Sequence, residues 1–414
     1  MSTVEQFTPS KKYNTIALLL IAIGVVAAVV LYITTHGAAA TPEEEHANHA
    51  RFWASLLQNS VFFLLVTNAA MFFMTATALA WGGWQISFTR VTEAVSAAVP
   101  VIGVLTIAIL FSIVYGGNHN IYHWTDAAHV EHDAILNFKK GFLNPTFFSV
   151  VTVLTVLGWS LLGWKMRKLS RSTDTTDFDN PKEKYSFQFK NTVVAGLFMV
   201  VFALTVMSST PWLWLMSINA HWYSTMYSWY TFASTFVAGV ALITLFVIYL
   251  KNKGQLQMVN KEHIHDLGKF MFAFSIFWAY LWFSQFMLIW YANISEETVY
   301  FKPRTQGAYT FVFWLMFIIN FIAPLLVFMS RDSKRNYTTI TYMSVLILFG
   351  QWLNFFQMVF PGPSPDKVPF IGYDIAIGLG FVGIIMFVVA RTLSKHPLIA
   401  SRHPFIKESV IHHT

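Results

Sequence analysis

The segment from 263 to 301 reads HIHDLGKFMFAFSIFWAYLWFSQFMLIWYANISEETVYF, and it decides the class of fold. Between positions 270 and 291 it has no charged residue and is dominated by Phe, Trp, Leu, Met and Ile. At about 1.5 Å of rise per residue, a helix of this length crosses a hydrocarbon layer roughly 30 Å thick. The segment therefore predicts a membrane-spanning helix. Its polar residues Tyr280, Ser284 and Gln285 need partners away from lipid.

The composition of the whole chain indicates the same environment. Of its 414 residues, 55% are hydrophobic and only 11% are charged, whereas soluble domains carry about 25% charged residues. The chain has no cysteine, which excludes thiolate-held iron–sulfur clusters, thioether-linked haem and disulfides. An integral membrane protein without a covalent cofactor is expected.

Ten apolar spans of about 20 residues can be read along the chain, which predicts an all-α fold with ten transmembrane helices. The first apolar run is longer than the h-region of a signal peptide, so we expect it to remain as a spanning helix. The predicted spans are 13–35, 52–80, 94–115, 144–164, 191–209, 224–250, 270–291, 308–330, 337–360 and 372–390.

The basic residues predict the orientation of these helices. With both termini in the cytoplasm, 21 of the 27 Lys and Arg residues fall in cytoplasmic segments and six in outer segments. Such an excess is typical of the cytoplasmic side of a membrane protein. The net charge of +7 is thus a topology signal and not a nucleic-acid footprint, and we expect a multi-pass protein of the bacterial inner membrane.

Histidines are absent from the apolar spans, which argues against haem b because its axial ligands must lie within the helices. The loop between the third and fourth spans is instead dense in His and Asp, including His123 and Asp126. A helical spacing there is compatible with a zinc or copper site, but an ordinary titratable interfacial loop explains it as well, and no metal signature decides between them.

Polar residues follow stripes on several spans, mostly in their outer halves. Such groups face the interior of a helix bundle, either as interhelical hydrogen bonds or as the lining of a cavity. The concentration in the outer half favours a cavity suited to a quinone headgroup or to water. The residues predicted to line it are His221, Ser224, Ser228, Tyr280, Ser284, Gln285, Gln351, Asn354 and Asp374.

Carboxylates are scarce near the membrane: Glu93 and Asp266 lie at the inner boundary and Asp374 at the outer one. None lies at mid-depth, where a pump places protonatable groups. The sequence supports proton half-channels, and a complete path would require bound water or partner subunits.

Four stretches resemble a known family: HDLGKFMFAFSIFWAYLWFSQFMLIWYANISEE at 265–297, FTRVTEAVSAAVP at 88–100, YHWTDAAHVEHDAILNFKKGFLNPTFF at 122–148 and WLMSINAHWYSTMYSWY at 214–230. Together they resemble the NrfD-like (PsrC-type) membrane subunits of bacterial alternative complex III, a quinol:cytochrome c oxidoreductase. The resemblance extends over about 52–360 and is greatest to the smaller of the two such subunits, quinone-binding subunit 2 (ActF). Where many relatives have Ser-Leu-Asp-Pro-His-Trp, this chain has Asn219 in place of the Asp, so it lacks that carboxylate.

The resemblance implies two four-helix bundles with flanking helices. We therefore expect a first helix and an acidic periplasmic loop at 1–51, bundles at 52–210 and 211–360, and a last helix with a basic cytoplasmic tail at 361–414. It also implies partners: a larger NrfD-like sister, an iron–sulfur protein, a multihaem cytochrome c and, in some bacteria, a haem–copper oxidase. Menaquinol is the implied substrate of the assembly, and this subunit is expected to contribute a quinone pocket or a proton path without a redox centre.

Two other functions remain open at this point. A purely structural membrane anchor would use the same polar residues only as interhelical contacts. A proton-coupled secondary transporter usually has repeated halves with broken helices at matching positions and charges near the midplane, and neither is evident here.

Overall fold

The computed structural model describes residues 5–37, 42–117, 119–176 and 178–413, with 42–47 described by their backbone alone. This part of the chain is helical and contains no strand, and ten of its helices are long and apolar enough to span a membrane. The prediction of an all-helical fold with ten candidate spans is confirmed. The spans are Lys11–Thr35, Asn48–Leu79, Trp84–Tyr115, Pro145–Ser172, Pro181–Trp214, Met226–Asn252, Lys261–Ala292, Thr310–Phe328, Tyr337–Val359 and Gly372–Leu393.

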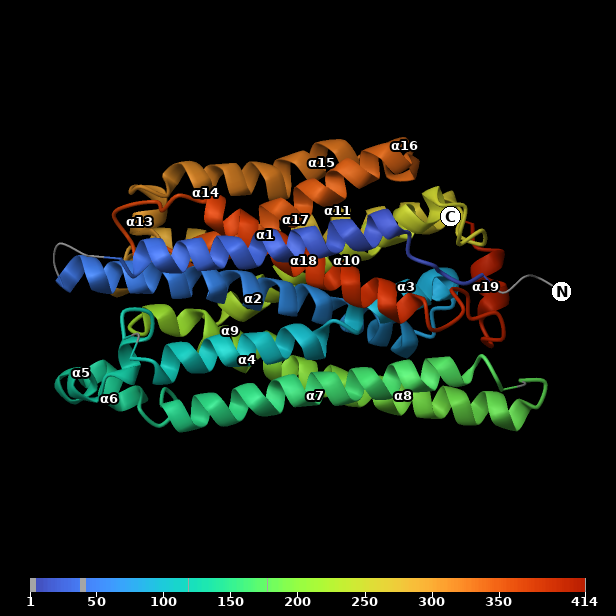
Figure 1. Ribbon diagram of the computed structural model, residues 1–414, viewed down its shortest axis with the longest axis horizontal. Coiled ribbons are helices and arrows are strands. Elements are labelled where there is room, and N and C mark those ends of the chain that lie inside the picture. Colours follow the sequence, from blue (N-terminus) through green and yellow to red (C-terminus); the bar gives the residue numbers. More distant parts are fainter. Residues whose placement is uncertain (1–4, 38–41, 118, 177, 414) are drawn as a thin grey trace.

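Seven spans are single helices, shown in Figure 1 as long ribbons that run side by side. Several extend beyond their apolar runs into polar sequence. A helix continues until a capping residue ends it, and it does not have to stop where the apolar run stops. These helices are α1 (Lys11–Thr35), α2 (Pro42–Leu79), α7 (Pro145–Ser172), α10 (Met226–Asn252), α11 (Lys261–Ala292), α17 (Tyr337–Val359) and α18 (Gly372–Leu393).

Three spans are interrupted. The third combines η1 (Trp84–Phe88), α3 (Thr89–Ser96) and α4 (Val99–Tyr115). The fifth runs from α8 (Pro181–Leu204) through η3 (Thr205–Ser209) to α9 (Thr210–Trp214), and the eighth runs from α14 (Thr310–Phe317) through η5 (Ile318–Ile322) to α15 (Ala323–Phe328). Both η3 and η5 are π-helical turns, which bulge the helix by one residue and are frequent at functional sites.

The first and last spans form a closely packed pair. A Cβ atom built on Gly24 of α1 would lie 2.5 Å from the Cα atom of Gly380 of α18, and one on Gly383 would lie 2.7 Å from the backbone oxygen of Ala17. Only glycine permits backbones to approach so closely, as is common between membrane helices. The pair rests on α2, which contacts both helices.

The core lies along α2 and α10, whose apolar stretches are buried almost throughout. Helix α2 packs against α4, α8, α10 and α18, while α10 also packs against α11 and α17. Helix α7 contacts α4 and α8 on one flank, and α14 contacts α17 on the other. The remaining helices therefore screen two buried helices, both of which carry interior polar groups.

The two ends of the molecule differ. At one end the amide of Leu398 donates to the carbonyl of Glu5 at 2.9 Å, and the short helices α16 (Arg331–Arg335) and α19 (Ile406–Val410) lie there. At the opposite end lie α5 (Ala127–His132) and α6 (Ala134–Lys139) (Figure 1). Following the predicted orientation, we name these the inner end and the outer end.

Candidate functional site

A hydrogen-bonded chain of four side chains joins α10 and α17 inside the protein. Ser234 donates to Oε1 of Gln351 at 2.7 Å, Asn354 donates to Oγ of Ser234 at 3.1 Å, and the Tyr230 hydroxyl donates to Oδ1 of Asn354. All four side chains are buried. Spacings of four residues on α10 and three on α17 place each pair on one helix face, which lets the two faces meet. We call these residues the outer polar chain.

Several amide atoms beside this chain have no partner among the described residues. They include Nε2 of Gln351, Nε2 of Gln285 and both polar atoms of Asn320. Asn320 lies in the π-helical turn η5 and faces α17 at Gly350, where an added Cβ atom would be 2.4 Å from its Oδ1. Because buried polar atoms are normally satisfied, such a group of unpaired amides indicates places for internal water.

A very small cavity, about 10 Å³ in volume, adjoins the outer polar chain at its outer side. Tyr230, Gln285 and Gln357 line it, together with Arg304 from α13 (Lys302–Thr305). The Arg304 guanidinium lies 3.5 Å from the centre of the Tyr300 ring, and its Nε donates to the carbonyl of Gln357 at 2.9 Å. Its Nη2 has no partner among the described groups. The cavity thus combines a buried cation, amides and a phenol.

Asp374 does not belong to this chain, because it is enclosed in an ion pair at the outer end. Arg51 of α2 donates to both carboxylate oxygens at 2.9 and 2.6 Å, and Ser55 donates to Oδ1 at 2.6 Å. Asn59 donates to the Asp374 carbonyl at 3.2 Å and accepts from Nε1 of Trp352 at 2.8 Å. The fully buried carboxylate is therefore held between α2 and α18 by two parallel hydrogen bonds from one guanidinium.

Glu93 lies in a second buried network at the inner end. Arg90 donates to Oε2 of Glu93 at 3.0 Å and to Oδ1 of Asp174 at 2.6 Å, so one guanidinium bridges two carboxylates. The Ser170 hydroxyl also donates to Glu93, and Arg167 donates to the hydroxyl of Ser96 at 3.0 Å. This network connects α3 to the inner end of α7.

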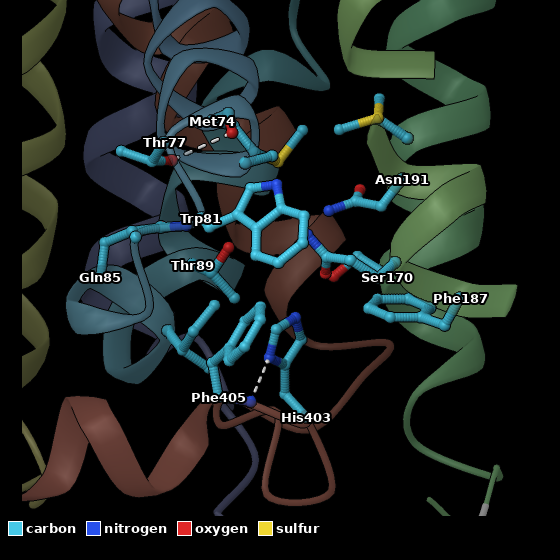
Figure 2. A pocket seen from close by; sticks show the side chains of 15 residues that line it. Met74, Thr77, Trp81, Gln85, Thr89, Ser170, Phe187, Asn191, His403 and Phe405 are labelled. Atoms are coloured by element: carbon cyan, nitrogen blue, oxygen red, sulfur yellow. Dashed lines mark hydrogen bonds between the residues drawn. The ribbon is translucent and has the colours of Figure 1, made fainter. Parts of the chain in front are cut away.

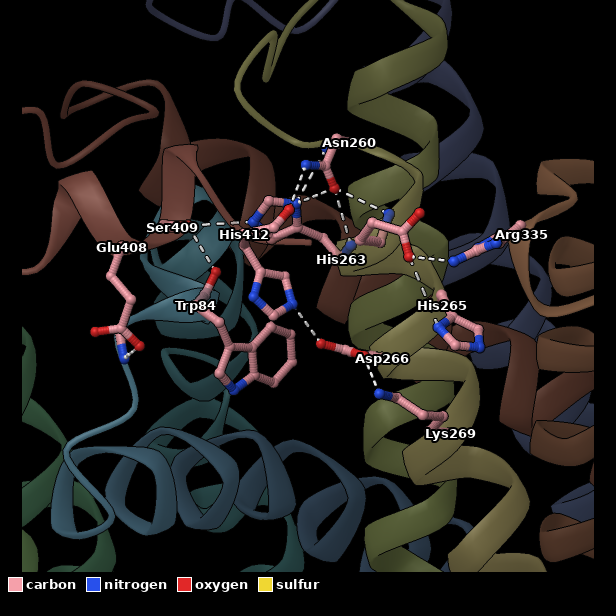
Figure 3. Close-up of polar contacts among 12 residues, drawn as sticks. Trp84, Asn260, His263, His265, Asp266, Lys269, Arg335, Glu408, Ser409 and His412 are labelled. Atoms are coloured by element: carbon pink, nitrogen blue, oxygen red, sulfur yellow. Dashed lines mark hydrogen bonds and ion pairs between the residues drawn. The ribbon is translucent and has the colours of Figure 1, made fainter. Parts of the chain in front are cut away.

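Asp266 lies in a third network, which includes the C-terminal segment (Figure 3). Lys269 approaches Oδ1 of Asp266 to 2.5 Å, and Nε2 of His412 approaches Oδ2 to 2.6 Å. His263 lies 3.2 Å from the hydroxyl of Ser409, which itself donates to the carbonyl of Trp84 at 2.6 Å. The C-terminal segment thereby fastens α11 to η1 at the start of the third span.

The structure separates the remaining residues of the predicted cavity. Tyr280 is 62% exposed on the surface of α11, and Ser284 donates to its carbonyl at 2.7 Å, so neither contributes to the outer polar chain. Tyr280 and Ser284 are one helical turn apart, as predicted, but they lie on the outward side of α11. Ser228 is buried and donates to the carbonyl of Ser208 at 3.3 Å. Of the predicted residues on α11, only Gln285 reaches the cavity.

His221 and Ser224 precede the sixth span, which begins at Met226, so the upper part of the predicted stripe is not helical. Nε2 of His221 lies 2.5 Å from Oδ2 of Asp133. Asp133 also caps α6 by accepting from the amides of Ile135 and Leu136 at 2.9 and 3.0 Å. The Leu136 amide and then His221 hold the pKa of this carboxyl below its usual value.

The His-rich outer loop has structural uses for its titratable groups. Asp126 caps α5 by accepting from the amides of Ala128 and His129, and the His123 ring centre lies 6.2 Å from that of His129. Within the described residues, no group of three or more His, Asp or Glu side chains is arranged to hold a metal ion. In this loop Asp126 therefore acts as the cap of a short helix.

Comparison with models of protein families and with curated protein sequences finds no match for this chain. The interpretation of the site therefore depends on its geometry and on the sequence resemblance described above.

The sequence did not identify three participants in these networks. Arg51 is 323 positions from Asp374, so nothing local pairs them. Ser234 and Tyr230 lie on α10, and neither is among the residues predicted from the sequence to line the cavity. A signal was present, since Tyr230 and Ser234 are four positions apart and present a second polar stripe on the same helix.

Proposed function

We propose that this chain is a membrane subunit of a respiratory quinol:cytochrome c oxidoreductase of the alternative complex III type, in which it provides a proton half-channel and has no redox centre. The observation that carries the half-channel is the outer polar chain with unpaired amides at both of its ends. The four resembling stretches supply the identity of the assembly.

Proton transfer along such a chain requires groups that donate and accept at once. The hydroxyls of Tyr230 and Ser234 do both, whereas an amide donates through nitrogen and accepts through oxygen. In this proposal the hydroxyls and internal waters conduct the proton. The amides of Gln351, Gln285 and Asn320 hold those waters in position, which is consistent with their unpaired atoms.

The short extent of the outer polar chain supports a half-channel instead of a complete proton path across the membrane. Gln351 lies 14 residues after Tyr337 at the inner start of α17, or about 21 Å along the helix axis. Among the described residues no hydrogen bond links Gln351 to Asp266 or Glu93. Protons reaching Gln351 from the outer cavity would need further water, or a partner subunit, to continue inward.

The size of the outer cavity favours water over a quinone headgroup at this position. Ligand pockets usually measure about 300–1,000 Å³, whereas this cavity has a volume of about 10 Å³, which is room for roughly one water molecule. The helix contacts are compatible with two bundles, α2, α4, α7 and α8 in one and α10, α11, α14–α15 and α17 in the other, flanked by the α1–α18 pair. In that arrangement the outer polar chain belongs to the second bundle.

The test is proton release by the intact assembly in proteoliposomes during quinol oxidation. Ser234→Ala interrupts the chain, and Gln351→Leu removes its inner amide; both should lower the number of protons released per electron while the assembly and its turnover persist. Ser284→Ala is the matched control, because that hydroxyl bonds only to its own helix. Unchanged proton release in both variants would contradict the half-channel and favour the alternative that this protein is a purely structural membrane anchor.

A further inference from the structure

A cavity of about 420 Å³ opens at the outer end, between the last turns of α11 and the segment that follows this helix. Its size lies within the usual range of ligand pockets, about 300–1,000 Å³, whereas the cavity at the inner end shown in Figure 2 has a volume of only about 40 Å³. The larger cavity lies beside α13, which Figure 1 shows at the same end as α5 and α6. We call it the α11–α13 cavity.

The cavity forms because the chain turns back over the membrane helix at Asn293. This residue ends α11 in the left-handed conformation, with a φ of 49°, and its amide donates to the carbonyl of Ile289 at 3.0 Å. The returning segment contains α12 (Ser295–Thr298) and α13. Phe301, just before α13, packs edge-on against Phe286 of α11 with ring centres 5.3 Å apart, and both rings line the cavity. This aromatic contact holds the segment at the end of the helix.

The two sides of the cavity have opposite character. Three apolar residues of α11 with the spacing i, i+3, i+4, and therefore on one face of the helix, form one side: Phe286, Ile289 and Trp290. Three polar residues of α13 and its C-cap with the same spacing form the other: Lys302, Thr305 and Gln306. The cavity is thus amphipathic, with its apolar side on the membrane helix and its polar side on the segment outside it.

The position of the cavity corresponds to the headgroup region of the membrane. Trp290 lies two residues before the end of α11 at Ala292, about 3 Å along the helix axis. It is 67% exposed and Tyr291 is 83% exposed, and exposed rings of this kind are typical of the membrane–water interface. Phe283 and Met287, seven and three positions before Trp290, are also exposed on the same face. An apolar stripe therefore continues from the cavity toward the middle of the membrane.

The charge of the cavity comes from one lysine. Of the described residues that line it, none is Asp or Glu, and Lys302 alone is cationic. Its ammonium group forms no ion pair within the described part of the chain, and it does not pair with Asp366, although both residues border a neighbouring cavity. Lysine binds a phosphate as a point charge, and the amide of Gln306 can donate a hydrogen bond beside it. The polar side of the cavity therefore suits a phosphate group.

We propose that the α11–α13 cavity binds an anionic phospholipid of the outer leaflet, with the lipid phosphate at Lys302 and one acyl chain along the apolar side and the exposed stripe of α11. A zwitterionic lipid fits less well, because its headgroup brings a second cation next to the lysine. A free phosphate fits less well, because it leaves the apolar side in water. The inference does not depend on the proposed half-channel, since no residue of the outer polar chain lines this cavity.

The experiment measures binding to the full-length chain in detergent by native mass spectrometry, with phosphatidylglycerol, phosphatidylcholine and glycerol 3-phosphate as probes. Phosphatidylglycerol should bind one saturable site more tightly than phosphatidylcholine, and glycerol 3-phosphate, which has the charge without the acyl chains, should bind much more weakly. Photoactivatable phosphatidylglycerol should label the peptide that contains Trp290 or Lys302. Equal binding of the two lipids, equally tight binding of glycerol 3-phosphate, or labelling only at other peptides would overturn the proposal.

Substitutions in the polar side separate charge from space. Lys302→Gln should weaken phosphatidylglycerol binding about fivefold, since one lysine near a membrane surface contributes about 1 kcal/mol. Lys302→Arg keeps the charge and should retain the binding, whereas Gln306→Trp fills the cavity from its exposed rim and should weaken it with Lys302 in place. Lys140→Gln removes the same charge from the outer end but lies outside the cavity, and it is the matched control. Equal affinity of Lys302→Gln and wild type would contradict the proposal.

A protein segment is the competing occupant, and native membranes distinguish it from lipid. A photoreactive side chain in place of Gln306, at the exposed rim of the cavity, should cross-link phospholipid. Cross-linking of another protein and of no lipid would assign the cavity to a protein contact and overturn the proposal.

Discussion

The two ends of this protein bury carboxylates in different ways. At the outer end Asp374 is enclosed by one guanidinium and one hydroxyl, and the Arg51 side chain is 12% exposed. At the inner end Glu93 shares Arg90 with Asp174, and Asp266 shares its charge between His412 and a half-exposed Lys269. The outer carboxylate has its cation to itself, whereas Glu93 shares its cation with Asp174 and Asp266 is bridged to both Lys269 and His412. The outer carboxylate is thus a clamp between two helices, and the inner ones are members of wider networks.

Removing the cation of the outer clamp should produce the largest effect on stability. Arg51→Leu leaves Asp374 buried without a counter-charge, which costs about 3–5 kcal/mol for a buried pair. The expected result is a lower yield of folded protein and a large fall in the midpoint of thermal unfolding in detergent. The double variant Arg51→Leu with Asp374→Leu removes both charges and should regain most of the loss. A double variant as unstable as the single one would show that Arg51 acts through other contacts.

Two serines test whether the hydroxyl contacts at the two ends are equivalent. Ser55→Ala removes a hydrogen bond to Asp374, and Ser170→Ala removes one to Glu93. A hydrogen bond to a charged group is worth about 1.5–3 kcal/mol, and Ser55→Ala should reach the upper part of that range because both groups of this contact are buried. Ser170→Ala should cost less, since Ser170 is half-buried and water can replace its hydroxyl. Denaturant midpoints of the two variants, compared with wild type, provide the measurement.

Sequence patterns predicted the fold well and the site only in part. Apolar runs located all ten candidate spans, since hydrocarbon imposes length and composition on a helix directly. The stripe on α17 placed Gln351 and Asn354 together correctly. Periodicity gives the face of a helix but not its neighbour, so the outward position of Tyr280 was not foreseen. The cavity at the inner end that Figure 2 shows was not predicted, because its walls come from segments as distant as 74–89 and 403–405.

Two glycines compare a tightly packed position beside the outer polar chain with an open position on a helix surface. The question is whether the position of the Asn320 amide depends on close packing. Gly350→Ala places a Cβ atom 2.4 Å from Oδ1 of Asn320 and 2.4 Å from Cγ2 of Ile319, so both buried side chains must move. Overpacking of this kind costs about 1–3 kcal/mol, and displacement of Asn320 should also reduce proton release. Gly196→Ala on α8 is the control, because nothing lies within 4 Å of its added Cβ atom. Equal stability of the two variants would show that η5 shifts freely.

The smallest effect is expected at the outer loop, where His221 contacts Asp133. The lowered pKa of Asp133 contributes stability above the ordinary Asp value of about 3.9, and this contribution is lost as the pH falls through the lower folded value. His221→Ala should raise that pKa only partway, since the Leu136 amide, its largest cause, remains. Infrared titration of the carboxyl band, assigned with Asp133→Asn, measures the shift. Proton release should not change in His221→Ala, because His221 lies outside the outer polar chain. A reduced proton release in this variant would instead place the His221–Asp133 pair at the mouth of the half-channel and extend the proton path beyond Tyr230.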